Sequence, residues 1–305
     1  MKYVAPPAPL GIGGVLDNWL RLFRSSFGSC WPIALLAAAA GALVQFSMSP
    51  RMPQYHAGTP LLQYYAEYWA TMRSGPTLLL SDIVFWFVSL LVYGGLLTQQ
   101  AALVRGEDPF PFGTALSKGL SRLPSLLLGW VLIILIVAAI CAPVGIGAAI
   151  MIRSSAPGGV FPLAVLAGIA LVILLIYVTV RLQVWMAAMF SENLGGTSSL
   201  KRSWALVKGH WWRVTGIMFV AGIVMWVVTG AIGVVVGIAI AAMGFHGATP
   251  DLVARRMQLI GSVSQVARLL TMPLMTAVWF AIYQDLRLRR EGGDLAARAE
   301  ALSGK

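Results

Sequence analysis

The chain has 305 residues, of which 58% are hydrophobic and only 11% are charged, and its mean hydropathy is +0.80. This balance leaves too little polar surface for a soluble globular protein of this length, so the composition predicts a polytopic membrane protein. The net charge of +11 does not indicate nucleic-acid binding, because the basic residues punctuate apolar runs instead of gathering on one solvated surface. We therefore expect no nucleic-acid partner.

Six apolar stretches are long enough to cross a bilayer as helices, for which about 20 residues are needed. In chain order they cover residues 30–48, 77–104, 123–152, 160–188, 214–243 and 260–284. The sequence thus predicts an all-α membrane protein with one six-helix domain over residues 1–286 and a charged cytoplasmic tail over residues 287–305. Stretches longer than the minimum imply tilt, or kinks at prolines such as Pro143 and Pro273.

Short basic segments with amphipathic patterns precede the first, third and fifth spans, at residues 15–32, 112–130 and 198–214. Each predicts an interfacial helix that leads into a pair of spans. The chain then reads as three pseudo-repeats of interfacial helix and helical hairpin, spaced about 90 residues apart. The alternative is that any cytoplasmic loop before a span is basic and amphipathic, and the sequence leaves both open.

The third of these segments reads "SSLKRSWALVKGHWWRV" and is rich in basic and aromatic residues. On a helix its apolar side chains recur at i, i+4, i+7 and i+11 and share one face, formed by Leu200, Trp204, Val207 and Trp211. Tryptophan and basic side chains are typical of the membrane interface. We expect contacts to anionic lipid headgroups from Lys201, Arg202, Lys208, Trp204, Trp211 and Trp212.

Orientation follows from the basic residues in the connecting segments, which concentrate on the cytoplasmic side of membrane proteins. Sixteen Lys and Arg residues fall on the side of the two termini and six on the other. The sequence therefore predicts a multi-pass protein of a bacterial inner membrane with both termini in the cytoplasm. Expected partners are membrane lipids with anionic headgroups, and a membrane-protein partner is a further candidate.

Ionisable residues near the ends of the spans are candidate functional residues, because burying a charge in a membrane is costly. Asp82 and Arg268 lie at similar depth near the outer ends of their spans and are a candidate pair. Towards the inner ends, a candidate charge cluster ties the fourth and sixth spans together; its members are Glu192, Arg202, Arg181, Asp285 and Arg287. Snorkelling and topology are the simpler explanations of such charges. A carboxylate at the middle of a span, which a proton-coupled carrier usually has, is missing from the sequence.

Enzyme signatures are equally sparse. His56, His210 and His246 fall in different loops and do not converge on one metal, and no HExxH, GxSxG or P-loop pattern occurs. We expect no enzyme activity, no metal and no cofactor. Gln99 and Gln100 are candidates either for lining a polar cavity or for bonding between helices. Small residues at i, i+4 spacing predict close helix packing within the chain, with homodimerisation as the alternative; they form the series Ala37–Gly41, Cys141–Gly145–Ala149, Ala164–Gly168 and Gly233–Gly237–Ala241.

Two segments, "SENLGGTSSLKRSWALVKGHWWRVTGI" and "AIYQDLRLRREGGDL", carry a family resemblance. They resemble the membrane-domain family associated with glycerophosphoryl diester phosphodiesterases and related uncharacterised bacterial integral membrane proteins. The matching positions in the first are Glu192, Arg202 to Trp204 and Leu206 to Gly209; in the second they are Tyr283, Asp285 to Arg287 and Arg289 to Gly292, while Gln284 replaces an aromatic residue.

The resemblance implies a six-span layout. Some relatives carry a soluble metal-dependent phosphodiesterase barrel after the membrane domain, for which we expect no room in a chain that ends at Lys305. The expected function is therefore that of a lipid-interacting scaffold or accessory subunit without enzyme activity. The alternative is a transporter or lipid-translocating protein with a cavity between helix hairpins.

Overall fold

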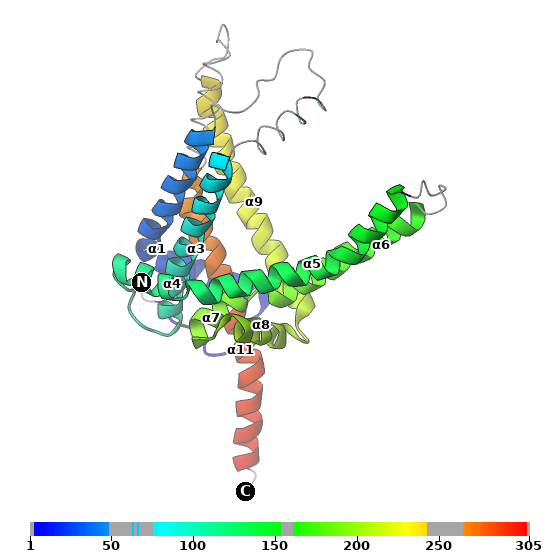
Figure 1. Cartoon of the computed structure of the whole chain (residues 1–305). Coiled ribbons are helices and arrows are strands. Elements are labelled where there is room, and N and C mark those ends of the chain that lie inside the picture. Colours follow the sequence, from blue (N-terminus) through cyan, green and yellow to red (C-terminus); the bar gives the residue numbers. More distant parts are fainter. Residues whose placement is uncertain are drawn as a thin grey trace.

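A computed structural model of the chain describes residues 3–48, 76–153, 161–242 and 265–303, together with the single residues 63, 66 and 261 (Figure 1). Every regular element in this described part is a helix. The long helices are α1 (Ile12–Met48), α3 (Pro76–Val104), α5 (Leu123–Arg153), α6 (Phe161–Leu182), α9 (Trp211–Ala242) and α11 (Arg268–Ser303). The short ones are α4 (Phe112–Ser121), α7 (Trp185–Glu192), α8 (Gly196–Val207) and η3 (Gln265–Ala267).

Six helical stretches of this part are long and apolar enough to cross a membrane. They are Ile12–Val44, Ile83–Val104, Leu123–Gly147, Ala164–Glu192, Trp211–Ala239 and Gln265–Gly292. The prediction of an all-α polytopic membrane protein is thereby confirmed. The first predicted interfacial segment continues without a break into its span as α1, whereas α4 and α8 are separate helices that precede α5 and α9. The boundary predicted at residue 286 falls inside α11, which is continuous to Ser303.

The long helices fall into two groups. Figure 1 shows α1, α3, α9 and α11 leaning together, while α5 and α6 run side by side away from them at a wide angle. Within the span windows, 67% of the residues of α3 and 61% of those of α11 are buried, against 11% for α5 and 6% for α9. The centre of the protein therefore lies along α3 and α11, and α5, α6 and α9 expose apolar surface of the kind that lipid covers.

The main hydrophobic core lies around α7, at the end of the molecule where α4, α7 and α8 gather, called the short-helix end here (Figure 1). Residues 185–190 of α7 are all buried, as expected of a helix that is apolar on every side. The helix ends at Asn193, whose left-handed backbone with φ of 56° is a common helix stop. The fourth predicted span thus ends in a short buried helix that the other elements surround.

Two glycines allow α3 and α4 to touch backbone to backbone. A Cβ atom added at Gly119 of α4 would lie 2.6 Å from the backbone carbon of Gly94 and from the backbone nitrogen of Gly95. Gly113, on the same helix, has open space at this position within the described part of the chain. Because backbone cannot move aside as a flexible side chain can, the crossing of α3 and α4 requires glycine at position 119.

The predicted series of small residues behave differently from one another. Gly41 of α1 lies against the side chain of Gln265, so the Ala37–Gly41 series faces a helix contact. A Cβ atom at Gly145, Gly168, Gly233 or Gly237 would meet nothing within 4 Å in the described residues. Among the described residues these four glycines therefore contact no other element, because their helices belong to the splayed, exposed part of the fold.

Replacing Gly119 by alanine should destabilise the protein, because the added methyl group meets backbone, and overpacking of this kind costs about 1–3 kcal/mol. The matched variant Gly113→Ala should be neutral or slightly stabilising, since alanine favours helix by roughly 0.5–1 kcal/mol over glycine. Thermal unfolding in detergent compares the two. Equal midpoints for both variants would contradict the close approach of α3 and α4.

Candidate functional site

Helix α8 has a buried face and an exposed face. Leu200, Ser203 and Leu206 are buried where α8 packs against α5, α6 and α7, and the Ser203 hydroxyl donates to the Arg181 carbonyl over 2.9 Å. Lys201 is exposed, and so is the Trp204 side chain at 41%. Trp204 therefore lies off the buried face that holds Leu200, although the predicted apolar face contained both.

A turn separates α8 from α9 and places the remaining aromatic residues. Gly209 has φ of 88°, a conformation in which glycine has no steric cost. Trp211 and Trp212 consequently begin α9 instead of continuing the face of α8. Trp212 is 80% exposed, while Trp211 is half-buried and stacks on Tyr177 of α6. Lys208 is also exposed, so the two lysines and the two exposed tryptophans lie on the outside of the short-helix end.

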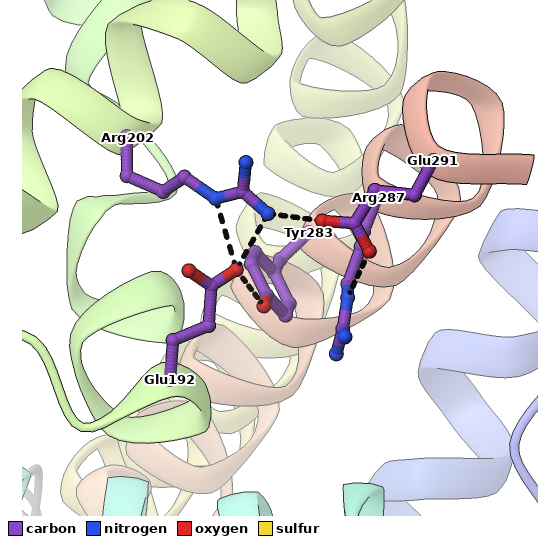
Figure 2. Close-up of polar contacts among 5 residues, drawn as sticks. All are labelled: Glu192, Arg202, Tyr283, Arg287 and Glu291. Carbon is purple, nitrogen blue, oxygen red and sulfur yellow. Dashed lines mark hydrogen bonds and ion pairs between the residues drawn. The ribbon is translucent and has the colours of Figure 1, made fainter. Parts of the chain in front are cut away.

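Behind this exposed surface, five side chains of three helices form a bonded chain, called the charge cluster here: Glu192 of α7, Arg202 of α8, and Tyr283, Arg287 and Glu291 of α11 (Figure 2). Nε of Arg202 donates to Oε1 of Glu192 over 2.9 Å, and the same guanidinium contacts the Glu291 carboxylate. The Tyr283 hydroxyl donates to Oε1 of Glu192 over 2.6 Å. Nε of Arg287 donates to Glu291 over 2.7 Å. The charge cluster therefore connects α7, α8 and α11.

Helix periodicity explains why these residues meet. Tyr283, Arg287 and Glu291 follow one another at i, i+4 and i+8, so they share one face of α11. Glu192 is the last residue of α7, where the chain turns towards α8. Burial lowers the pKa of Arg202, but its hydrogen bonds to Glu192 and Glu291 outweigh burial and raise that pKa above its ordinary value. Arg202 therefore stays charged and is engaged with carboxylates, which removes it from the set of exposed headgroup contacts.

Asp285 lies on another face of α11 and makes a second group, called the N-terminal clamp here, with Arg213, Arg289 and the backbone of Leu10. Its Oδ2 accepts from Nε of Arg213 over 2.8 Å and from Nε of Arg289 over 3.1 Å. Its Oδ1 accepts from the Leu10 amide over 3.0 Å, and both arginines donate to the Leu10 carbonyl over 2.6 Å. With Asp285 only 2% exposed, the clamp is a nearly buried ion group that fixes the segment before α1.

Polar side chains extend this clamp towards the N-terminus. The Tyr3 hydroxyl is 2.7 Å from Oε1 of Gln284 and 3.0 Å from Oδ1 of Asn18, and all three residues are buried. Burial raises the pKa of Tyr3, against the hydrogen bonds to Asn18 and Gln284, so the phenol remains neutral. Gln284 stands where the resembled family has an aromatic residue. Its hydrogen bond with Tyr3 connects α11 to the N-terminal segment.

Arg181 lies between two aromatic rings and not beside Asp285. Its guanidinium donates to the Tyr177 hydroxyl over 2.6 Å and to the Trp204 carbonyl over 3.1 Å, and its Cζ lies 4.9 Å from the centre of the Trp204 ring. This is a cation–π arrangement, which is stronger where water is excluded. Arg181 thereby attaches the end of α6 to α8.

The five residues predicted to form one charge cluster are therefore divided among three groups, which corrects the prediction. Glu192, Arg202 and Arg287 are in the charge cluster, Asp285 is in the N-terminal clamp, and Arg181 is in the aromatic site. The reason is that positions 285 and 287 are two residues apart on a helix and face different sides. Glu291, Tyr283, Arg213 and Arg289 were not among the predicted site residues. The i, i+4 spacing of Arg287 with Glu291 and of Asp285 with Arg289 was the available signal.

The predicted outer pair cannot be placed, since the side chain of Asp82 lies outside the described residues. The guanidinium of Arg268 lies 4.6 Å from the centre of the Phe85 ring. Gln99 and Gln100 are both buried and bond between elements: Gln99 exchanges two bonds with the backbone of Phe110, and Gln100 donates to the Pro273 carbonyl over 2.8 Å. In the described ranges, no three His, Cys, Asp or Glu side chains gather as metal ligands would.

Replacing Asp285 by asparagine should cost about 3–5 kcal/mol of unfolding free energy, because two partly buried arginines lose their counter-charge. The matched control is Asp17→Asn, which breaks the exposed pair with Arg21 and should cost about 1 kcal/mol or less. Equilibrium unfolding in mixed micelles measures both. A loss at position 285 no larger than that at position 17 would refute the structural importance of the clamp.

Glu192→Gln should destabilise the protein by about 1–3 kcal/mol, less than Asp285→Asn, because the Glu192 side chain is 21% exposed and Gln can still accept from Tyr283. The same unfolding assay applies. If Glu192→Gln and Glu192→Gln/Arg202→Gln are both as stable as the wild type, the charge cluster does not hold α7 and α8 in place.

A comparison with protein families finds one that matches most of the chain. Residues 29–286 match a family model described as a domain of unknown function (DUF7847), a stretch that runs from α1 into α11 and includes most of the charge cluster. Comparisons with curated proteins and with solved structures found no match. Because the matched stretch covers most of its length, the chain belongs to the DUF7847 family.

Proposed function

We propose that this membrane protein is a non-enzymatic scaffold or accessory subunit of the bacterial inner membrane that holds anionic lipid headgroups at its cytoplasmic face. The observation that carries the proposal is the exposed surface of the short-helix end, which presents the side chains of Lys201, Lys208, Trp204 and Trp212. The count of sixteen basic residues against six supports a cytoplasmic location for this end and for both termini.

The chemistry of this surface suits a lipid interface. Indole rings combine an apolar body with one N–H donor and therefore favour the headgroup level. Each lysine near an anionic membrane surface gains about 1 kcal/mol. Since the charge cluster holds α8 from behind, its exposed side chains would meet the headgroups without first ordering the helix, which lowers the entropic cost of binding.

The alternative is a transporter or lipid-translocating protein, and one observation favours it. A cleft of about 270 Å³ lies between α3, α9 and α11, lined mainly by apolar side chains that include Tyr93, Met218, Met225, Met272 and Met275. Methionine adapts to irregular apolar partners, so this cleft suits an acyl chain better than a polar solute. The bonding of Gln99 and Gln100 to backbone carbonyls speaks for a structural role of the pair and against a polar pathway.

Kinship with the membrane-domain family of glycerophosphoryl diester phosphodiesterases is a further proposal. It is supported by the two sequence segments that carry the resemblance, which supply Glu192 and Arg202 on one side of the charge cluster and Tyr283, Arg287 and Glu291 on the other. These residues have a structural explanation in the charge cluster, and no catalytic role follows from them.

Native mass spectrometry of the protein from gently extracted membranes tests the proposal. The wild type should retain anionic phospholipid, and Lys201→Gln/Lys208→Gln should retain less, since two headgroup contacts are lost. The matched control, Arg24→Gln/Arg290→Gln, removes two exposed charges elsewhere and should retain as much as the wild type. A wild type free of lipid, or equal retention by both variants, would contradict the proposal.

A further inference from the structure

A separate cleft opens between α3, the loop from α3 to α4, the end of α4 and the end of α7, away from the exposed face of α8. Its volume is about 450 Å³. The lining residues are Thr98, Ala101, Arg105, Glu107, Phe110, Lys118, Ser121, Arg122, Phe190 and Asn193. Three of these side chains are basic and one is acidic, so the cleft has an excess of positive charge that favours an anion.

The single carboxylate of the cleft is already paired. Glu107 accepts from Nε of Arg105 over 2.7 Å and from its terminal nitrogen over 3.1 Å, a two-pronged bond. This hydrogen bond from Arg105 lowers the pKa of Glu107, so the carboxylate stays ionised and balances the charge of Arg105. The excess charge of the cleft therefore belongs to Lys118 and Arg122.

Lys118 and Arg122 are held in place but keep donors to offer. The Lys118 ammonium lies 3.5 Å from the centre of the Phe110 ring, a cation–π contact that leaves its N–H groups available. Arg122 donates to the side-chain oxygen of Asn193 over 2.5 Å and, at 3.5 Å, to its carbonyl. These bonds use part of a five-donor guanidinium. Among the described residues, neither side chain has a carboxylate within ion-pair distance.

Arg105 and Arg122 also fix the walls of the cleft. Arg105 donates to the Phe190 carbonyl over 3.0 Å, and Arg122 binds Asn193, so both hold the C-terminal end of α7. The walls are thus fixed by bonds to α7, and the close approach of Gly119 to Gly94 fixes α4 against α3. A cleft with fixed walls and fixed donors binds an anion without first being ordered.

We infer that this cleft binds a phosphate group, with Lys118 and Arg122 donating to its oxygens. Guanidinium and ammonium donors suit phosphate, which offers several acceptor oxygens. The group belongs to a phospholipid headgroup or to a soluble phosphate. Leu120 and Phe112, on the same helix as Lys118, are exposed apolar side chains. The lipid as the source rests on the proposed function, whereas the site itself does not.

Binding to the purified full chain in neutral detergent tests the inference, with native mass spectrometry as the readout. The probes are phosphatidylglycerol, diacylglycerol as the lipid without a phosphate group, and inorganic phosphate. Lys118→Gln should weaken the binding of one phosphatidylglycerol about tenfold, the effect expected of one lost charge-assisted bond. Lys118→Arg should restore it, and Arg24→Gln, an exposed charge removed on α1, should leave it unchanged.

Comparing the probes identifies the source of the phosphate group. Phosphatidylglycerol binding that depends on Lys118 supports a headgroup site; inorganic phosphate binding that depends on Lys118, without lipid binding, supports a soluble ligand. If Lys118→Gln binds both phosphate probes as well as Arg24→Gln does, or if phosphatidylglycerol binds no tighter than diacylglycerol and inorganic phosphate does not bind, the inference is wrong.

The two proposals fail separately. Loss of lipid in Lys201→Gln/Lys208→Gln, with no loss of lipid or of inorganic phosphate in Lys118→Gln, would leave the proposed function standing and overturn the cleft. The reverse pattern would support the cleft and overturn the role of the exposed face of α8.

Discussion

Paired carboxylates and guanidinium groups on two faces of α11 hold the short-helix end of this protein together. Apolar side chains gain little from meeting one another in lipid, because acyl chains are just as apolar, so polar bonds and close packing carry more of the specificity of helix association there. One face of α11 reaches α7 and α8 through Tyr283 and Glu291. The other reaches α9 and the segment before α1 through Asp285. Four parts of the chain, distant in sequence, thus depend on one helix.

This arrangement relates the splayed hairpin to the centre of the protein. Helices α5 and α6 pack against each other and against α8, and Figure 1 shows them leaving the other long helices. Arg181 attaches α6 to α8, and Arg202 attaches α8 to α11. Helix α8 therefore connects the exposed hairpin of α5 and α6 to the buried pair α3 and α11. A lipid or protein that binds α8 would bind where these two parts meet, which is consistent with a scaffold or accessory role.

The sequence predicts the large features of the fold, because hydrophobicity and length alone identify six spans. Contacts set by short-range spacing were partly predictable: Glu192 with Arg202 was expected, and the i, i+4 pair of Asp285 with Arg289 was readable but overlooked. Glycine roles were not predictable. Gly41 and Gly233 have the same small-residue pattern, yet only Gly41 meets another element in the described part, because the splay of the helices decides which face is covered. The cleft beside Lys118 combines three helices and a loop and has no local sequence signal.

Hydrogen–deuterium exchange of the α8 amides in Glu291→Gln tests most directly whether α11 holds the short-helix end. Glu291 bonds Arg202 of α8 and Arg287 of α11, so its replacement removes a link between the two helices. Residues 196–207 should then exchange faster than in the wild type, while Arg24→Gln leaves them unchanged. Unchanged protection of α8 in Glu291→Gln would contradict the dependence of this end on α11.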